Sequence, residues 1–201
     1  MRGLYLVTPN WDDTEQLLAV TQQALQAGVA LLQYRHKSAD AALRRSQATA
    51  LLALARRYGV PLIINDHLDL CAALDADGLH VGGTDMTVAE ARAQLGPGKI
   101  VGASCYGELA LAHAAQAAGA SYVAFGGFYP SLVKQYPVTT PPDIVAQAKR
   151  ELALPVVVIG GMTPDNAAAL VARGADMVAA ISSVVQASDV VIAVRKFNAL
   201  F

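Results

Sequence analysis

Two short apolar stretches of this chain each run into a carboxylate. Residues 61–64 precede Asp66, and residues 78–81 precede Asp85. The carboxyl ends of consecutive parallel strands meet at one rim, where α/β proteins build their sites. Two carboxylates at such a rim suit a hard divalent cation that keeps several waters and binds a phosphate-bearing substrate. The alternative is that Asp66 caps the following helix and Asp85 lies in a solvated turn.

A second polar group occupies alternate positions at the end of another apolar run, namely Gln33, Arg35 and Lys37. Side chains alternate between the faces of a strand, so these three are expected on one face. A guanidinium together with an ammonium group suits a phosphate or pyrophosphate. The alternative is an ion pair with Asp66 or another rim carboxylate. Both interpretations hold if a metal and the cations share one pyrophosphate.

The second half of the chain suggests another anion site. Gly160-Gly161 precede a helix that begins at Thr163, and Ser182 follows the last apolar run. Barrels frequently bind phosphate with the loops after their last two strands, where glycine lets a ligand approach the backbone N–H groups. Lys134 lies in the longest irregular stretch, 126–142, and would add a cation if that loop folds over the site.

The histidines offer no catalytic arrangement. His113 lies in an alanine-rich helical stretch and is expected at the surface, His80 is expected to be a hydrogen-bonded interior residue, and His36 alternates away from the Arg35 face. None is paired with a nucleophile, and no Ser–His–Asp pattern is visible. The chemistry is therefore expected to need charge stabilisation more than proton transfer.

The elements that position these residues follow a regular order. Eight apolar runs, each followed by a helical stretch, predict a single-domain (β/α)8 TIM barrel over residues 1–201, because runs that are apolar throughout are typical of parallel strands covered on both faces. An open doubly wound sheet is the alternative. It would place a glycine-rich nucleotide loop after the first strand, where Thr8-Pro9-Asn10-Trp11 stands instead. The predicted strands are residues 4–7, 29–35, 61–64, 78–81, 99–103, 122–125, 155–159 and 176–181.

Composition narrows the class of protein. The 201 residues are 54% hydrophobic and 15% charged with a formal net charge of −1, which argues against disorder and gives no support for nucleic acid or a membrane as partner. Two cysteines in no metal-like spacing, Cys71 and Cys105, indicate small apolar fillers and a reduced, cytoplasmic setting. The first residues leave no room for a signal peptide, and the apolar stretch 177–194 holds too many polar groups to span a membrane. The sequence is compatible with a homo-oligomer.

As a set, the motifs resemble the thiamine phosphate synthase family. The resemblance covers nearly the whole chain in order. It is carried by Gln33-x-Arg35-x-Lys37, Asn65-Asp66, residues 76–82 with Asp85, Gly102-Ala103-Ser104, Pro130-Ser131-x-x-Lys134, Ile159-Gly160-Gly161-Met162 and Ile181-Ser182.

This resemblance implies a transferase that joins hydroxymethylpyrimidine diphosphate to a thiazole phosphate and releases pyrophosphate. It implies a dissociative mechanism in which the diphosphate leaves first, the aminopyrimidine stabilises the methylene cation, and the thiazole nitrogen attacks without a general base. It implies Mg²⁺ on Asp66 and Asp85. The pyrimidine diphosphate would be held by Gln33, Arg35, Lys37, Asn65, Ser104 and Lys134, and the thiazole phosphate by Ser131, Val133, Gly161, Ile181 and Ser182.

Three departures from the family pattern leave alternatives open. Gly83 stands where the family usually has glutamine, Ser131 and Val133 stand where it favours threonine, and the loop from Gln135 to Pro142 is rich in proline and threonine. A valine cannot donate a hydrogen bond to phosphate. One rival is a thiazole tautomerase relative, which transfers protons with a histidine. The other is a non-catalytic phosphate-binding barrel.

Overall fold

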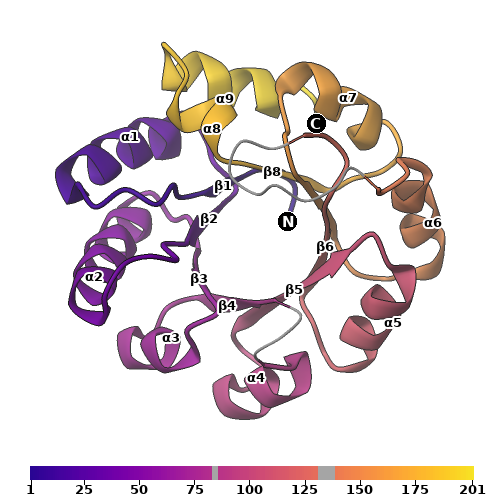
Figure 1. Ribbon diagram of the computed structural model, residues 1–201, viewed down its shortest axis with the longest axis horizontal. Helices are drawn as coiled ribbons and strands as arrows, with labels where there is room; N and C mark the ends of the chain where they lie inside the picture. Colours follow the sequence, from indigo (N-terminus) through magenta and orange to yellow (C-terminus); the bar gives the residue numbers. More distant parts are fainter. Residues whose placement is uncertain (83–85, 131–138) are drawn as a thin grey trace.

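The chain forms a closed barrel of eight parallel strands in sequential order, and β1 pairs with both β2 and β8 to complete the ring (Figure 1). The structure is a computed structural model, and it describes residues 1–82, 86–130 and 139–201. The strands are β1 Gly3–Val7, β2 Leu31–Tyr34, β3 Leu62–Asn65, β4 Gly78–Val81, β5 Ile100–Tyr106, β6 Tyr122–Phe125, β7 Val156–Ile159 and β8 Met177–Ala180.

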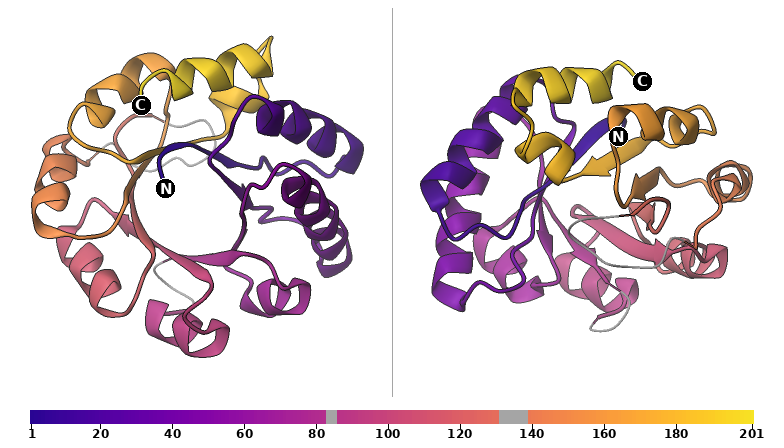
Figure 2. Two further views of the ribbon diagram at one scale, coloured as in Figure 1. Left: turned by 180° about the vertical axis from the view of Figure 1, so that it is seen from behind. Right: turned by 45° about the horizontal axis from the view of Figure 1, so that its top comes forward.

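Helices surround this barrel, as the views from the front and from behind both show (Figures 1 and 2). None of the described helices combines the length and apolar character needed to cross a bilayer. In the described part of the chain the helices are α1 Thr14–Gln26, α2 Ala41–Arg57, α3 Leu68–Leu74, α4 Val88–Leu95, α5 Leu109–Ala117, α6 Asp143–Glu151, α7 Pro164–Val171, α8 Ser182–Val185 and α9 Val190–Asn198.

Side-chain caps determine where several of these helices begin. Asp13 accepts a hydrogen bond from the backbone N–H three residues on, and so does Asp40 at the start of α2. Thr87 and Thr163 form capping boxes at the starts of α4 and α7, and Pro164 occupies the first helical position after Thr163. These residues satisfy backbone donors that have no partner within the helix.

Alternation along the strands divides the apolar side chains into two cores. One core lies inside the barrel and includes Tyr5, Leu31, Ile63, Val157 and Met177. The other, larger core packs the outward faces of the strands against the helices. Because both faces of each strand are covered, the strands are apolar throughout, and this pattern made the barrel recognisable in the sequence.

The predicted barrel is confirmed, and the open doubly wound sheet is wrong because β1 and β8 pair. Three local predictions need correction. The second strand covers only Leu31–Tyr34, instead of residues 29–35. The fifth strand continues three residues beyond its expected end, to Tyr106, with an irregular register between Ser104 and Tyr106. The eighth strand stops at Ala180, and a four-residue helix, α8, begins directly after Ile181.

Candidate functional site

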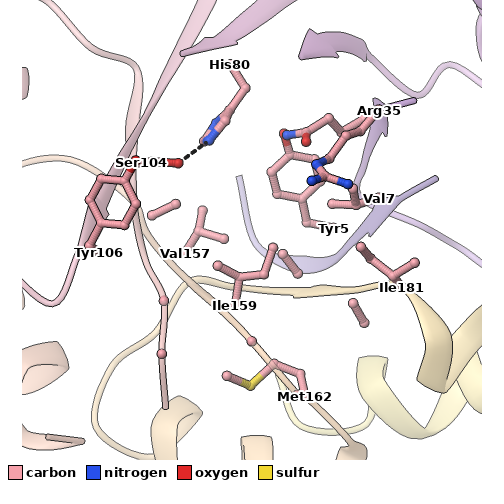
Figure 3. Close-up of a pocket in the computed structure, with 18 of the residues that line it drawn as sticks. Tyr5, Val7, Arg35, His80, Ser104, Tyr106, Val157, Ile159, Met162 and Ile181 are labelled. Atoms are coloured by element: carbon pink, nitrogen blue, oxygen red, sulfur yellow. Dashed lines mark hydrogen bonds between the residues drawn. The ribbon is translucent and has the colours of Figure 1, made fainter. Parts of the chain in front are cut away.

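A cavity of about 350 Å³ opens at the carboxyl ends of the strands, with side chains from most of the barrel in its wall. Figure 3 shows Arg35 and Tyr5 on one side of it, with Ser104 and Tyr106 on the other. The site was predicted from the sequence to lie at this end of the barrel. The predicted residues that line the cavity are Gln33, Arg35, Lys37, Asn65, Asp66, Ser104, Gly161, Ile181 and Ser182.

The predicted alternation at the end of β2 is confirmed, because Gln33, Arg35 and Lys37 all face the cavity. Thr8, just after β1, holds this segment in place: its hydroxyl accepts a hydrogen bond from the Arg35 N–H at 2.8 Å and donates to the Arg35 carbonyl oxygen at 3.2 Å. Arg35 is 7% exposed. An arginine that is buried at the wall of a cavity is positioned to bind an anion there.

Asp66 does not cap α3, so that part of the alternative is wrong, whereas its other part concerns Asp85, which lies outside the described residues. The N-cap residue is His67, and no side chain makes a cap hydrogen bond there. Asp66 has a left-handed backbone, with φ 61°, which is uncommon outside glycine and best tolerated by Asp and Asn. Its Oδ2 accepts a 2.6 Å hydrogen bond from Asn65 Nδ2 and lies 3.7 Å from Lys37 Nζ. The predicted contact between a β2 cation and Asp66 is therefore present for Lys37.

The donors around Asp66 suit a magnesium ion that is bound partly by substrate. Its carboxylate is a hard oxygen ligand, and Gly82 beside it carries no side chain that would fill the space. Within the described residues no group of three or more His, Cys, Asp or Glu side chains could form a complete metal cage. Mg²⁺ characteristically uses one or two carboxylates, waters and substrate phosphates instead of such a cage.

Another part of the cavity wall comes from the segments after β7 and β8, and it includes two glycines. Gly160 and Gly161 have φ of 110° and 63°, and a Cβ on Gly161 would collide with the carbonyl oxygen of Pro130. Only glycine fits this backbone. Asn166 in the α7 capping box steadies the turn by donating to the Gly161 carbonyl oxygen at 2.9 Å. Gly160, Gly161 and Ser182 line the cavity together, which is the predicted grouping.

His80 is a hydrogen-bonded interior residue, as predicted. Its Nδ1 lies 2.9 Å from the Tyr122 hydroxyl and its Nε2 lies 2.9 Å from the Ser104 hydroxyl (Figure 3). His113 is exposed and contacts Glu151 at 2.9 Å, which confirms its expected surface position. A histidine whose two nitrogens are both engaged inside the barrel is not arranged as a free base.

Four of the predicted site residues, Asp85, Ser131, Val133 and Lys134, lie outside the described residues, as does Gly83. Their assignments stay predictions. Both cysteines are buried, and burial raises the pKa of the Cys71 thiol to about 11 and that of Cys105 to about 12. These protonated thiols are apolar fillers, as expected.

Several aromatic and apolar residues of the cavity wall were missed. Tyr5 could have been found from its alternation with Val7 in β1, since both point into the barrel. Tyr106, 40% exposed with a left-handed φ of 51°, owes its position to the irregular end of β5. Tyr129 and Met162 come from loops whose course had no periodic signal.

Comparison with known proteins identifies the family. The sequence model described as thiamine monophosphate synthase matches residues 4–184. The chain belongs to this family. A thiamine-phosphate synthase of Janthinobacterium sp. (strain Marseille) is 67% identical over 100% of this chain and 97% of the relative. One of Thiobacillus denitrificans is 52% identical over 99% of this chain and 94% of the relative.

Solved structures agree with the thiamine monophosphate synthase assignment. Thiamine phosphate pyrophosphorylase from Pyrococcus furiosus superimposes with a TM-score of 0.85 at 30% sequence identity, covering 98% of this chain and 94% of that one. Membership of the thiamine monophosphate synthase family makes this chain a transferase of thiamine biosynthesis. The family resemblance of the motifs is thereby confirmed, and so is the expected barrel.

Proposed function

We propose that this chain joins hydroxymethylpyrimidine diphosphate to hydroxyethylthiazole phosphate, giving thiamine phosphate and pyrophosphate. One observation carries the proposal: a single cavity has cationic side chains and a carboxylate on one wall and glycine backbone on another. Two differently built anion-binding walls suit a reaction between two phosphorylated molecules. The small-molecule substrates and the transferase class follow the family, and the residue roles below follow the geometry.

The diphosphate half of the site lies at the ends of β2, β3 and β5. Arg35 and Lys37 supply positive charge, and Asn65 and Ser104 supply neutral hydrogen-bonding groups at the same wall. Charge-assisted bonds from Arg and Lys to phosphate oxygens are stronger than neutral ones. In this assignment Gln33, deeper in the barrel, contacts the pyrimidine ring, and Lys134 adds a further cation.

Asp66 is assigned as one magnesium ligand and Asp85 as the other. In the structure the Asp66 carboxylate accepts a hydrogen bond from Asn65 and lies 3.7 Å from Lys37 Nζ. Both partners are themselves assigned to the diphosphate, so binding of substrate and metal would replace these contacts and leave neither Asp66 nor Lys37 without a partner. When bound, the ion neutralises charge that develops on the departing pyrophosphate.

The thiazole phosphate is assigned to the loops after β7 and β8. Gly161 and Ser182 offer backbone N–H groups at the wall, Ser182 adds a hydroxyl, and Ile181 contacts the ring. Ser131 and Val133 complete this half in the family pattern. Placed there, the thiazole faces the carbon from which the diphosphate leaves, and positioning replaces a bimolecular encounter.

A dissociative mechanism needs no general base, and the cavity is consistent with this. Among its described lining residues, His80 is the one histidine, and its nitrogens face Tyr122 and Ser104. The thiazole nitrogen attacks with its own lone pair after the carbon–oxygen bond to the diphosphate has broken. The protein's task is then to hold both substrates and to stabilise the leaving group.

The test is pyrophosphate release measured with each substrate alone and with both, in the presence and absence of Mg²⁺. The proposal expects release, together with thiamine phosphate, only when both substrates and Mg²⁺ are present. Binding of both phosphates without release would favour a non-catalytic barrel. Isomerisation of a thiazole phosphate without metal would favour the tautomerase alternative.

A further inference from the structure

A chain of hydrogen bonds crosses the interior of the barrel from β2 to β5. Gln33 Nε2 donates to the Tyr5 hydroxyl at 2.6 Å, and the two phenolic oxygens of Tyr5 and Tyr122 lie 2.7 Å apart. The Tyr122 hydroxyl lies 2.9 Å from His80 Nδ1, and His80 Nε2 lies 2.9 Å from Ser104 Oγ. Both ends of the chain, Gln33 and Ser104, line the cavity, while Tyr122 does not.

Counting the available protons gives the hydrogen bonds of this chain one donor-to-acceptor direction, from Gln33 to Ser104. The Tyr5 hydroxyl accepts from Gln33, and among the hydrogen bonds of the described residues Tyr122 is the one acceptor for the Tyr5 proton, so we assign Tyr5 as the donor to Tyr122. Tyr122 then donates to His80 Nδ1, which must be unprotonated. The neutral imidazole therefore carries its proton on Nε2 and donates it to Ser104. The Ser104 proton is left to donate into the cavity, and the Gln33 carbonyl oxygen is left to accept.

The environment keeps the two phenols in this neutral, donating state. Tyr5 is 1% exposed and Tyr122 is fully buried, and burial raises the pKa of both hydroxyls well above the usual value. The Tyr5 and Tyr122 rings meet edge to face, with centroids 5.7 Å apart, and the Tyr122 ring stacks on His80 at the same separation. These contacts restrict the rotation of each ring.

Gly102 makes room for Tyr122, the central residue of the hydrogen-bonded chain. In the sheet it lies opposite both His80 on β4 and Tyr122 on β6. A Cβ at this position would collide with the Tyr122 ring, whose hydroxyl passes over the glycine to reach His80. The glycine in the middle of β5 is explained by this close approach, since glycine otherwise weakens a strand interior.

We propose that Tyr5, Tyr122 and His80 are positioning residues that present Gln33 as an acceptor and Ser104 as a donor to the ligand. This inference rests on the proposed function for its ligand. An aminopyrimidine diphosphate matches such a wall, because its exocyclic amine donates and its ring nitrogens and phosphate oxygens accept. A ligand of the opposite polarity would leave the buried Gln33 and the half-buried Ser104 unsatisfied, which is costly in a desolvated site.

The direct test is ¹⁵N NMR of the imidazole nitrogens in the full-length protein without substrate, with the His80 signals assigned by their loss in His80→Gln. The expected result is the Nε2–H tautomer of His80 in the wild type. Because the tautomer is read in the wild type and needs no turnover, this test stands apart from the proposed activity. The Nδ1–H tautomer in the wild type would overturn the inference.

Tyr122→Phe provides the functional test, since it removes the donor to His80 Nδ1 and keeps the ring. His80 should then populate the Nδ1–H tautomer, and Ser104 should turn its proton toward His80. The KM for the pyrimidine diphosphate should rise about tenfold, the equivalent of one hydrogen bond, with the KM for the thiazole phosphate unchanged. An unchanged tautomer, or equal rises in both KM values, would contradict the inference.

Tyr34→Phe is the matched control. Tyr34 is also a buried tyrosine of the barrel, but its hydroxyl donates to Gln47 at 3.0 Å and it does not line the cavity. It should lower stability without moving the His80 tautomer or either KM. A tautomer shift in this control would show that His80 responds to any loss of packing, and would contradict the specific role assigned to Tyr122.

Discussion

The two ends of the barrel contain similar polar residues that have different partners. Before β4, Asp77 accepts a 2.8 Å hydrogen bond from the Leu62 N–H, and before β8, Asp176 accepts one of 2.7 Å from the Val156 N–H. After β3, Asp66 instead contacts side chains at the cavity wall, Asn65 and Lys37. Carboxylates at the amino ends bind the protein's own backbone, whereas Asp66 at the carboxyl end contacts groups that a substrate can also bind.

Two arginines differ in the same way. Arg92 of α4 donates to the carbonyl oxygens of Gly96, Lys99 and Gly119, at distances from 2.7 to 3.1 Å. Arg35 lines the cavity. Under the proposed function, residue type does not separate structural from substrate-binding polar groups in this fold, whereas the end of the barrel at which they lie does.

The largest expected effect is that of Asp66→Asn. Asparagine tolerates the left-handed backbone at this position but binds Mg²⁺ poorly, so turnover should fall on the order of 10²–10³-fold while the melting temperature stays unchanged. Steady-state kinetics and thermal unfolding measure the two outcomes. Normal turnover in Asp66→Asn would contradict the assignment of Asp66 as a magnesium ligand.

Asp77→Asn is the control for that variant at the other end of the barrel. It replaces a charged acceptor of the Leu62 N–H by a neutral one, so the free energy of unfolding should fall by about 1 kcal/mol while turnover per folded molecule is kept. If the two variants behaved alike, the division between the ends would be wrong.

Arg35→Ala tests the second contrast. Loss of a charge-assisted contact should weaken binding of the pyrimidine diphosphate about 10–100-fold and leave the affinity for thiazole phosphate within about twofold. Isothermal titration calorimetry with each substrate separates the two. Equal losses for both would contradict the assignment of Arg35 to one half of the site.

Arg92→Ala is the counterpart of this change. Three carbonyl oxygens would lose a charged donor, so the free energy of unfolding in urea should fall by about 2 kcal/mol, and kcat/KM for both substrates should be unchanged at a temperature where the protein is folded. A selective loss of substrate affinity would show that the amino end of the barrel also shapes the site.

The smallest effect is expected for a residue that lies at the carboxyl end of the barrel but outside the cavity lining. Thr163 caps α7 two residues after Gly161, but its side chain accepts from the Asn166 N–H and is not part of the cavity lining. Thr163→Ala should cost about 1 kcal/mol of unfolding free energy and leave both KM values unchanged. A raised KM for thiazole phosphate with unchanged stability would make Thr163 a ligand-binding residue.

Much of the fold and one wall of the site could be predicted from local sequence. The period-two spacing of Gln33, Arg35 and Lys37 and the glycines at 160–161 are local signals, and each determines a face or a backbone conformation directly. The N-cap and proline at the start of α7 are equally local. These predictions are confirmed by the positions of the residues around the cavity.

The interior hydrogen-bonded chain could not be predicted in the same way. Tyr5 and Tyr122 are 117 residues apart, and their contact depends on closure of the barrel and on the space left at Gly102. The irregular register that places Tyr106 at the cavity wall depends likewise on pairing between β5 and β6. Such contacts are set by strand stagger, which composition and periodicity along one strand do not specify.

The central claim is that a magnesium ion held by Asp66 and the cations Arg35 and Lys37 share one pyrophosphate. The most direct measurement is a crystal structure of the protein with Mg²⁺ and pyrophosphate. We expect pyrophosphate against Arg35 and Lys37, with the ion bound to Asp66 and Asp85. Pyrophosphate bound elsewhere, or an ion that leaves Asp66 bonded only to Asn65 and Lys37, would contradict it.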